Sequence, residues 1–221
     1  MIYDFHTHTT LSDGDLTPLE IIRRASVNRY RVIALTDHIG VASLGQVIER
    51  LKEDCALAEK HWNILALPGV ELTHVPTRSI NEVARKAKQL GARIVLVHGE
   101  TIVEPVEKGT NLAALQCPYV DILAHPGLLT SEEATLAAQN GVFLEITARR
   151  GHCLTNGHVA RLATKAGCKL LLNSDAHDED DLLTSRLAHD ITVGAGLDVK
   201  TCQQVLRMNP HLLAEKISSV F

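Results

Sequence analysis

Histidine and carboxylate residues recur in short motifs along this 221-residue chain, and both types are common ligands of transition metals. Zinc, manganese and iron accept imidazole and carboxylate donors, and no cysteine lies in these motifs to favour a thiolate site. Gathering so many acidic groups without cations would bury several like charges, which is costly. We therefore interpret the motifs as a metal site. The residues concerned are His6, His8, Asp13, Asp37, His38, Glu71, His98, His125, Glu145, Asp175 and His177.

Each of these residues taken alone also has a structural interpretation. His125 precedes Pro126 and would suit a turn, and Asp175 could cap a helix. The donors together are too many for a single ion. A carboxylate that offers one oxygen to each of two ions is a natural way to hold a second, and Glu71 is the candidate for that bridge. The motifs therefore predict a site with more than one ion.

Strand-sized apolar runs alternate with helix-sized amphipathic segments over most of the chain. The apolar runs lie at 2–5, 32–35, 64–72, 93–97, 120–124, 142–146 and 169–172, and the helical segments at 18–28, 44–61, 80–90, 131–139 and 158–165. This alternation predicts a parallel sheet covered by helices. The candidate ligands follow the C-terminal ends of these strands. Such ends converge on one mouth in a closed barrel, whereas an open sheet spreads them along an edge. We therefore predict an α/β fold: a distorted seven-stranded, TIM-like barrel with the metal site at the C-terminal ends of its strands.

The composition is that of an ordinary folded protein. Hydrophobic residues make up 45% of the 24.1 kDa chain and charged residues 22%, and no linker-like segment divides it. We expect a single domain over residues 1–221. The last part of the chain, residues 198–221, is predicted to form two helices, the second of which begins at Asn209.

Several classes of protein are disfavoured by the same data. No apolar run approaches the roughly 18 to 20 residues that cross a bilayer. No signal peptide is visible, and the five scattered cysteines are typical of reduced thiols, so we expect a cytoplasmic protein without a membrane partner. A net charge of −4 and an aromatic content of 3% disfavour, without excluding, a nucleic-acid partner. The oligomeric state is left open.

The motifs resemble the signature of the PHP (polymerase and histidinol phosphatase) family. They follow in the family's order from residue 2 to the helix at Asn209. The chain has no attached polymerase segment and is similar to the compact, stand-alone, metal-dependent phosphoesterases of the family. The matching stretches are His6-Thr7-His8, Ser12-Asp13-Gly14, Thr36-Asp37-His38, Gly69-Val70-Glu71, Val97-His98, Ala124-His125-Pro126 and Ser174-Asp175-Ala176-His177.

The resemblance implies three divalent metal ions, which would be Zn, Mn or Fe. It also implies hydrolysis of a small phosphate monoester, histidinol-phosphate-like or nucleotide-like, by a hydroxide that bridges two of the ions. Glu71, Asp175 and His177 are then the catalytic residues. The first ion would be held by His6, His8, Glu71 and Asp175, the second by Glu71, His98 and His125, and the third by Asp13, His38 and His177.

Further polar residues follow the sixth predicted strand. Arg149 and Arg150 could grip a phosphate in a bidentate fork, and we predict that they bind the substrate. His152 is a candidate acid for the leaving group. Glu145 lies at the mouth with no assigned role, and Asp37 is expected to orient a neighbouring ligand rather than to bind metal.

Three other functions remain as alternatives. A nuclease or exonuclease acting on phosphodiesters is the nearest. A nucleic-acid-binding barrel subunit of an RNA-processing complex is less favoured, because this chain is acidic and keeps all its ligands. The amidohydrolases also begin with a His-x-His motif, but they normally use a lysine after the fourth strand, where this chain has His98.

Overall fold

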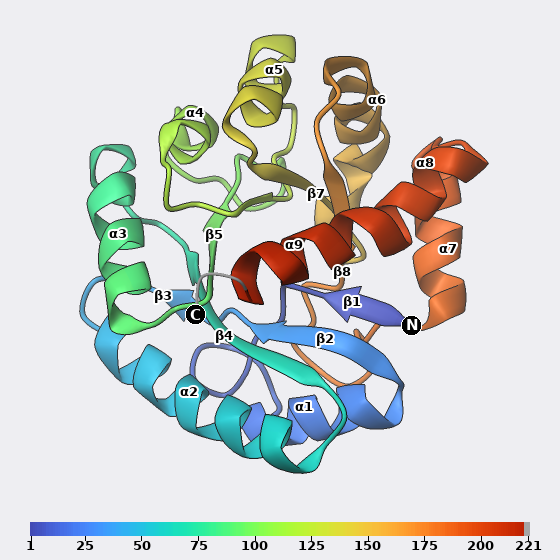
Figure 1. Cartoon of the computed structure of the whole chain (residues 1–221). Coiled ribbons are helices and arrows are strands. Elements are labelled where there is room, and N and C mark those ends of the chain that lie inside the picture. Colours follow the sequence, from blue (N-terminus) through green and yellow to red (C-terminus); the bar gives the residue numbers. More distant parts are fainter. Residues whose placement is uncertain (219–221) are drawn as a thin grey trace.

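The computed structural model describes residues 1–218 and contains one mostly closed parallel sheet (Figure 1). Seven strands pair in the order β1-β2-β4-β5-β6-β7-β8, and a two-residue strand, β3, pairs with β4 beyond the end of β2. The predicted seven-stranded barrel is confirmed. The strands are β1 (Ile2–Asp4), β2 (Tyr30–Leu35), β3 (His38–Ile39), β4 (Leu65–Leu72), β5 (Ile94–His98), β6 (Ile122–Ala124), β7 (Phe143–Thr147) and β8 (Leu170–Asn173).

The barrel closes through the segments that follow β1 and β8. Thr7 forms a parallel bridge with Ala176. The backbone N–H of His8 donates to the carbonyl oxygen of Ala176 at 2.8 Å, and that of Asp175 donates to the carbonyl oxygen of His6 at 2.9 Å. The first and last motifs of the chain are thereby brought together by the backbone that closes the barrel.

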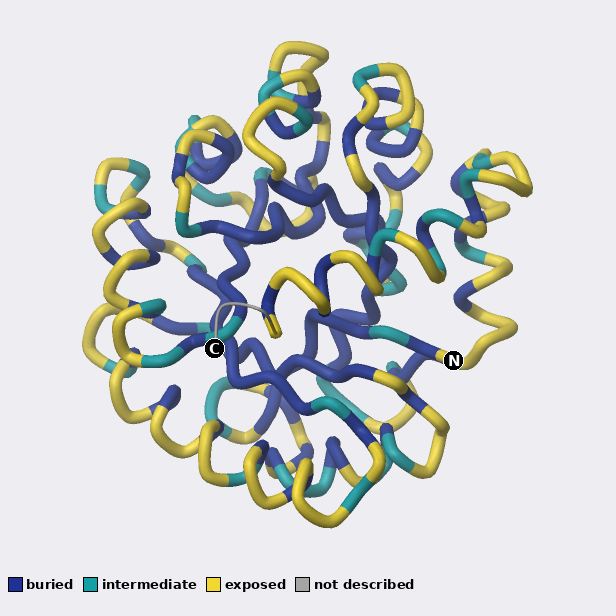
Figure 2. Tube along the Cα trace, in the orientation of Figure 1, coloured by how far each residue is buried: buried dark blue, intermediate teal, exposed yellow. Residues whose placement is uncertain are grey.

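Helices surround the sheet and keep their outer faces exposed (Figures 1 and 2). α1 begins with Pro18 after Thr17, and α5 has a capping box in which Thr130 and Glu133 bond reciprocally. α4 and α7 were not predicted. The helices are α1 (Pro18–Val27), α2 (Leu44–His61), α3 (Ile80–Leu90), α4 (Thr110–Gln116), α5 (Ser131–Asn140), α6 (Asn156–Ala166), α7 (Ser185–Gly194), α8 (Val199–Gln203) and α9 (Asn209–Ser218), with short helical turns η1 (Thr77–Ser79), η2 (His152–Thr155) and η3 (Gln204–Met208).

The N-terminal end of the barrel is covered by α9, which crosses it in the foreground of Figure 1. Leu213 and Ile217 of α9 pack with side chains from inside the barrel, including Phe5 and Ile94. The amide of Asn209 donates to the carbonyl oxygen of Leu170 at the start of β8. The opposite, C-terminal end is therefore the one left for the site.

The last two helices agree with the sequence prediction, and the second begins at Asn209 as expected. α8 and α9 are joined through the π-helical turn η3. Pro210 lacks an N–H and its ring crowds the preceding turn, and a widened π turn relieves that conflict. The predicted end of the second helix at Phe221 lies outside the described residues.

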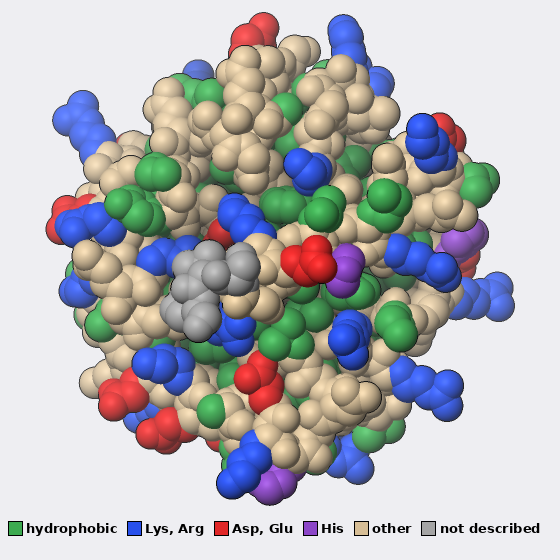
Figure 3. Space-filling model, viewed as in Figure 1, with side chains coloured by type: hydrophobic (Ala, Val, Ile, Leu, Met, Phe, Trp, Pro, Cys, Tyr) green, Lys and Arg blue, Asp and Glu red, His purple; other side chains and the backbone are tan. Residues whose placement is uncertain are grey.

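The face that carries α9 shows scattered Lys and Arg side chains among acidic and hydrophobic ones (Figure 3). Among the described residues, no helix is both long and apolar enough to span a membrane.

Candidate metal centre

All nine predicted ligands lie at the C-terminal end of the barrel, on or just after its strands. Glu71 is in β4, His98 ends β5, His125 follows β6, and Asp175 and His177 follow β8. The remaining four lie on the segments after β1 and at the short strand β3. Within residues 1–218, their donor atoms form overlapping groups of the size and spacing that hold metal ions.

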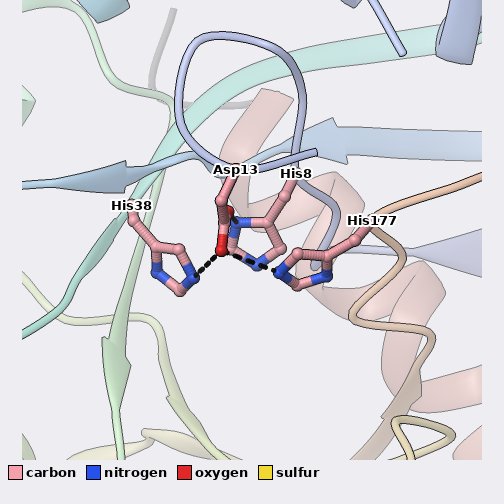
Figure 4. A group of neighbouring side chains, drawn as sticks. All are labelled: His8, Asp13, His38 and His177. Atoms are coloured by element: carbon pink, nitrogen blue, oxygen red, sulfur yellow. Dashed lines mark ion pairs between the residues drawn. The ribbon is translucent and has the colours of Figure 1, made fainter. Parts of the chain in front are cut away.

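The first group surrounds Asp13 (Figure 4). Oδ2 of this carboxylate lies 3.4 Å from Nε2 of His177 and 3.6 Å from Nε2 of His38. Nδ1 of His8 lies 3.9 Å from the other oxygen. The Asp13 side chain is 55% exposed, so this group is the one open to solvent. The structure thus adds His8 to the three residues expected to share the third ion.

The second group is buried and centres on Asp175. Its Oδ1 lies 3.1 Å from Nε2 of His8 and 3.6 Å from Nε2 of His6. His8 therefore turns one ring nitrogen toward Asp13 and the other toward Asp175. Both His125 and Asp175 have positive φ angles, 23° and 55°, which are unfavourable for residues other than glycine. Such strain persists where the surroundings hold a side chain in one required direction.

Glu71 lies between histidines from different strands. Its Oε2 is 3.4 Å from Nε2 of His6 and 2.8 Å from Nδ1 of His38, whereas its Oε1 is 3.5 Å from Nε2 of His125. The two oxygens of one buried carboxylate thus face two sets of donors. This is the placement that a bridging ligand needs.

A third group consists of His98, His125 and His152. His98 and His125 were predicted ligands, but His152 had been considered only as an acid. Nε2 atoms of His98 and His152 lie 3.5 Å and 3.7 Å from Oε2 of Glu104, a carboxylate that the sequence analysis did not single out. His74 is exposed beside this group, with its ring 6.2 Å from that of His98.

Several buried donor atoms in the site have no hydrogen-bond partner among the described residues. Leaving buried polar atoms unpaired costs free energy unless another group satisfies them. Imidazole lone pairs and a carboxylate oxygen are the atoms that a divalent cation would bind, so the residues present fit metal ions. The atoms are Nε2 of His6, Nδ1 and Nε2 of His8, Oε1 of Glu71 and Nδ1 of His125.

Electrostatics separates the imidazoles of the site from one another. Burial, together with neighbouring imidazoles, holds the pKa values of His8 and His125 well below the usual value. Burial and His98 lower the pKa of His152 to about 4. At neutral pH these three rings are neutral, which is the form that binds metal.

The pKa values of the two buried carboxylates Asp175 and Glu71 are shifted in opposite directions. Burial, reinforced by the charges of Glu71 and Glu145, raises the pKa of Asp175 well above the usual value. The pKa of Glu71 is held well below its usual value, because the facing imidazoles of His6 and His38 outweigh burial. Without cations, it would cost free energy to hold both Glu71 and Asp175 in the ionised form.

Two further carboxylates hold the ligands in place. Glu145 accepts a hydrogen bond from Nδ1 of His6 at 2.9 Å, which leaves Nε2 directed into the site. Asp37 accepts from the backbone N–H of Thr9 at 2.7 Å and from the hydroxyl of Ser12 at 2.8 Å. Asp37 thereby fixes the loop that carries both His8 and Asp13.

The two arginines lie in different surroundings. Nη1 of Arg149 lies 2.7 Å from Oδ2 of Asp181, and the same oxygen accepts the backbone N–H of His177 at 3.0 Å. Arg149 is therefore anchored beside the open group. Arg150 is exposed on the turn that follows. The structure brings one of the pair, rather than a fork of two, to the site.

No known protein-family profile matches the chain. An uncharacterized protein of Methanocaldococcus jannaschii is 47% identical over 218 residues, which is 98% of this chain and 100% of that protein. A probable phosphatase of Caldanaerobacter subterraneus is 31% identical over 194 residues, or 80% of this chain and 76% of that protein. The 5'-3' exoribonuclease Rnm of Escherichia coli is 30% identical over 171 residues, 76% of this chain but 50% of that protein.

Among solved structures, the fold is similar to that of histidinol phosphate phosphatase from Lactococcus lactis, in a complex with zinc, L-histidinol and phosphate. The TM-score is 0.63 at 16% identity, with 89% of this chain and 94% of that chain covered. A likeness at this identity shows the fold alone. The phosphatase relatives, together with this fold and the motif residues gathered at one end of it, place the chain in the PHP (polymerase and histidinol phosphatase) family.

Proposed function

We propose that this chain is a metal-dependent hydrolase of a small phosphate monoester, such as a histidinol-phosphate-like or nucleotide-like compound. The observation that carries the proposal is the convergence of nine imidazole and carboxylate ligands, four of which have buried donor atoms without a hydrogen-bond partner among the described residues. Members of the family with phosphatase names are similar over most of this chain, which supports a phosphate ester as substrate.

His6, His8, Glu71 and Asp175 would hold one ion. His98 and His125 would hold a second with Glu71, and His38, Asp13 and His177 a third. When bound, the ions supply an activated water as nucleophile and neutralise the charge on the phosphoryl oxygens. The donor types suit zinc, manganese or iron.

The chain's own residues have clear tasks in this proposal. Glu145 holds the tautomer of His6 that presents Nε2, and Asp37 holds the loop of His8 and Asp13. Arg149, fixed by Asp181, supplies a positive charge beside the solvent-open group. A phosphate dianion approaching from that side would meet the guanidinium as well as the ligands.

A phosphodiesterase acting on nucleic-acid ends is the second candidate, because the relative Rnm is named as a 5'-3' exoribonuclease. The chain spans only half of that protein, and its net charge is −4. A protein that tracks a polynucleotide backbone is usually basic. A small monoester is therefore the preferred substrate.

The test uses the full chain, stripped with a chelator and reloaded separately with Mn²⁺, Zn²⁺ or Fe²⁺. Phosphate release is measured from L-histidinol phosphate, nucleoside monophosphates and phosphotyrosine, and nucleotide release from a 5'-phosphorylated oligoribonucleotide. We expect metal-dependent turnover of at least one monoester at a higher kcat/KM than the oligonucleotide. Turnover of the oligonucleotide alone would replace the proposal with the nuclease, and turnover of neither substrate class would refute both.

A further inference from the structure

We propose that His152 is a metal ligand in addition to the nine, and that it completes the site formed by His98 and His125. The inference rests on the metal dependence in the proposed function, and it extends the site by a residue outside the family motifs. It replaces the earlier interpretation of His152 as an acid for the leaving group.

The position of His152 is not that of a surface histidine. It is the first residue of η2, directly after Gly151, whose φ of 88° allows a tight turn back toward the barrel. The residue is only 7% exposed. Its ring stacks on that of His125, with centroids 4.3 Å apart and planes 25° apart. A neutral imidazole buried in this way needs a partner for each ring nitrogen.

One ring nitrogen of His152 already has such a partner. Nδ1 lies 2.8 Å from the hydroxyl of Thr101, which is itself buried. The other nitrogen, Nε2, is directed toward the point that Nε2 of His98 also faces. Both Nε2 atoms lie within 4 Å of the same oxygen of Glu104, at 3.7 Å and 3.5 Å.

The same pattern occurs at three of the predicted ligands. Nδ1 of His6 is bonded to Glu145, Nδ1 of His98 to the carbonyl of Gly99, and Nδ1 of His177 to the carbonyl of Asp175. Metal-binding histidines commonly have one ring nitrogen held by an outer group, so that the other is aimed at the ion. His158, which is not in the site, instead uses Nε2 to bond the carbonyl of Leu129.

The contact with Glu104 alone does not account for three clustered imidazoles. The Glu104 side chain is 47% exposed, and an ion pair with a half-exposed carboxylate contributes little. Among these three imidazoles, the contact with Glu104 also involves only those of His98 and His152, and not that of His125. A divalent ion among the rings of His98, His125 and His152 would bind nitrogen lone pairs that are otherwise close together in a buried cluster. With Glu71 as bridge, the donor set would become three imidazoles and a carboxylate, to which a zinc ion that expands to five-coordination could still add a water.

The experiment measures metal binding rather than turnover. The chelator-stripped full chain is titrated with Zn²⁺ against a chromophoric competitor, as wild type, His152→Ala, Thr101→Val and His74→Ala. We expect His152→Ala to weaken one of the binding steps by at least about 10-fold and Thr101→Val to weaken the same step less. His74→Ala, which removes an exposed imidazole near the same glutamate, should leave every step unchanged.

A crystal structure of the zinc-loaded wild type, with anomalous data at the zinc edge, locates the ions without the need for a variant. We expect an ion about 2.0 to 2.1 Å from Nε2 of His152. Unaltered zinc affinity in His152→Ala, or an ion bound by His98 and His125 more than about 3 Å from Nε2 of His152, would overturn the inference and leave the proposed function standing. Failure of the wild type to bind zinc, manganese or iron would instead refute the proposed function itself.

Discussion

Nδ1 of His6 lies 2.9 Å from Oε2 of Glu145, and both side chains are fully buried. The same carboxylate oxygen accepts a hydrogen bond from the side-chain amide of Asn173 at 3.0 Å. The segment after β1, β7 and β8 thus contribute to one unit in which a carboxylate, an imidazole and the metal position would be aligned. A carboxylate behind a ligating histidine fixes its tautomer and raises its basicity.

Glu145→Gln should therefore weaken metal binding although the residue is not a ligand. The substitution removes the negative charge and keeps the size of the side chain. Losing such a hydrogen-bond partner behind a ligand typically lowers metal affinity or activity by 10- to 100-fold. Zinc affinity by chelator competition measures the effect. Thermal unfolding of the metal-free protein serves as the control, since a loss of stability without a change in zinc affinity would mean that Glu145 only supports packing.

Glu71→Gln should have a larger effect than Glu145→Gln. The substitution leaves one oxygen in place but removes the charge that faces His6 on one side and His125 on the other. We expect the loss of at least one ion and a fall in kcat of about 10²-fold or more, the order found when a contact to the transition state is lost. Elemental analysis together with kinetics checks this. A variant with full metal content and near wild-type turnover would disprove the bridging role.

The covering of the barrel by α9 predicts a contrast between two neighbouring leucines. Leu213 is fully buried against the barrel interior, whereas Leu212 is 46% exposed. Leu213→Ala should lower the free energy of unfolding by about 2 to 5 kcal/mol, because it leaves a cavity. Leu212→Ala should change it by no more than about 0.5 kcal/mol. Urea denaturation of both variants provides the comparison, and equal effects would mean that α9 does not close the barrel in solution.

The barrel, and the end of it that carries the candidate site, were predictable because two independent signals in the sequence agree. Apolar runs such as 93–97 and 120–124 mark strands buried on both faces, and a ligand such as His98 or His125 follows each run at once. Parallel strands then bring those positions together whatever the loops do. β3 was missed because its two residues, His38 and Ile39, are too few to produce an alternating pattern.

His152 and Glu104 could not be assigned in the same way. Neither follows a strand directly, and the sequence Gly-His-Cys around His152 matches no motif. Their positions depend on how two loops fold against each other, which Thr101 and Gly151 determine through a hydrogen bond and a turn. For His152 the available signals were its place after the sixth predicted strand and the number of histidines in the chain, 12, which exceeds what the motifs use.

The two arginines should differ when they are changed separately. Arg149 is anchored by Asp181 beside His177, while Arg150 is exposed. Arg149→Ala should lower kcat/KM for a phosphomonoester by roughly 10- to 100-fold with metal content intact, the scale of losing a charged contact to substrate. Arg150→Ala, the matched control, should have little effect. If the two variants lose activity equally, the pair acts as the bidentate fork predicted from the sequence.

Metal binding should stabilise the folded chain. The buried donors cannot be satisfied by one another, and an ion that binds the folded state more tightly than the unfolded one shifts the equilibrium by mass action. At a free metal concentration of 100 times Kd the gain is about 2.7 kcal/mol for one site, which for a chain of this size corresponds to roughly 5 to 10 °C in Tm. Differential scanning calorimetry of the stripped protein with and without added zinc measures the shift. Glu71→Gln should show a smaller shift at the same zinc concentration, because the two sites that Glu71 would bridge have lost an anionic ligand. An unchanged Tm for the wild type under these conditions would mean that the cluster is satisfied without metal, and the interpretation of its unpaired nitrogens would be wrong.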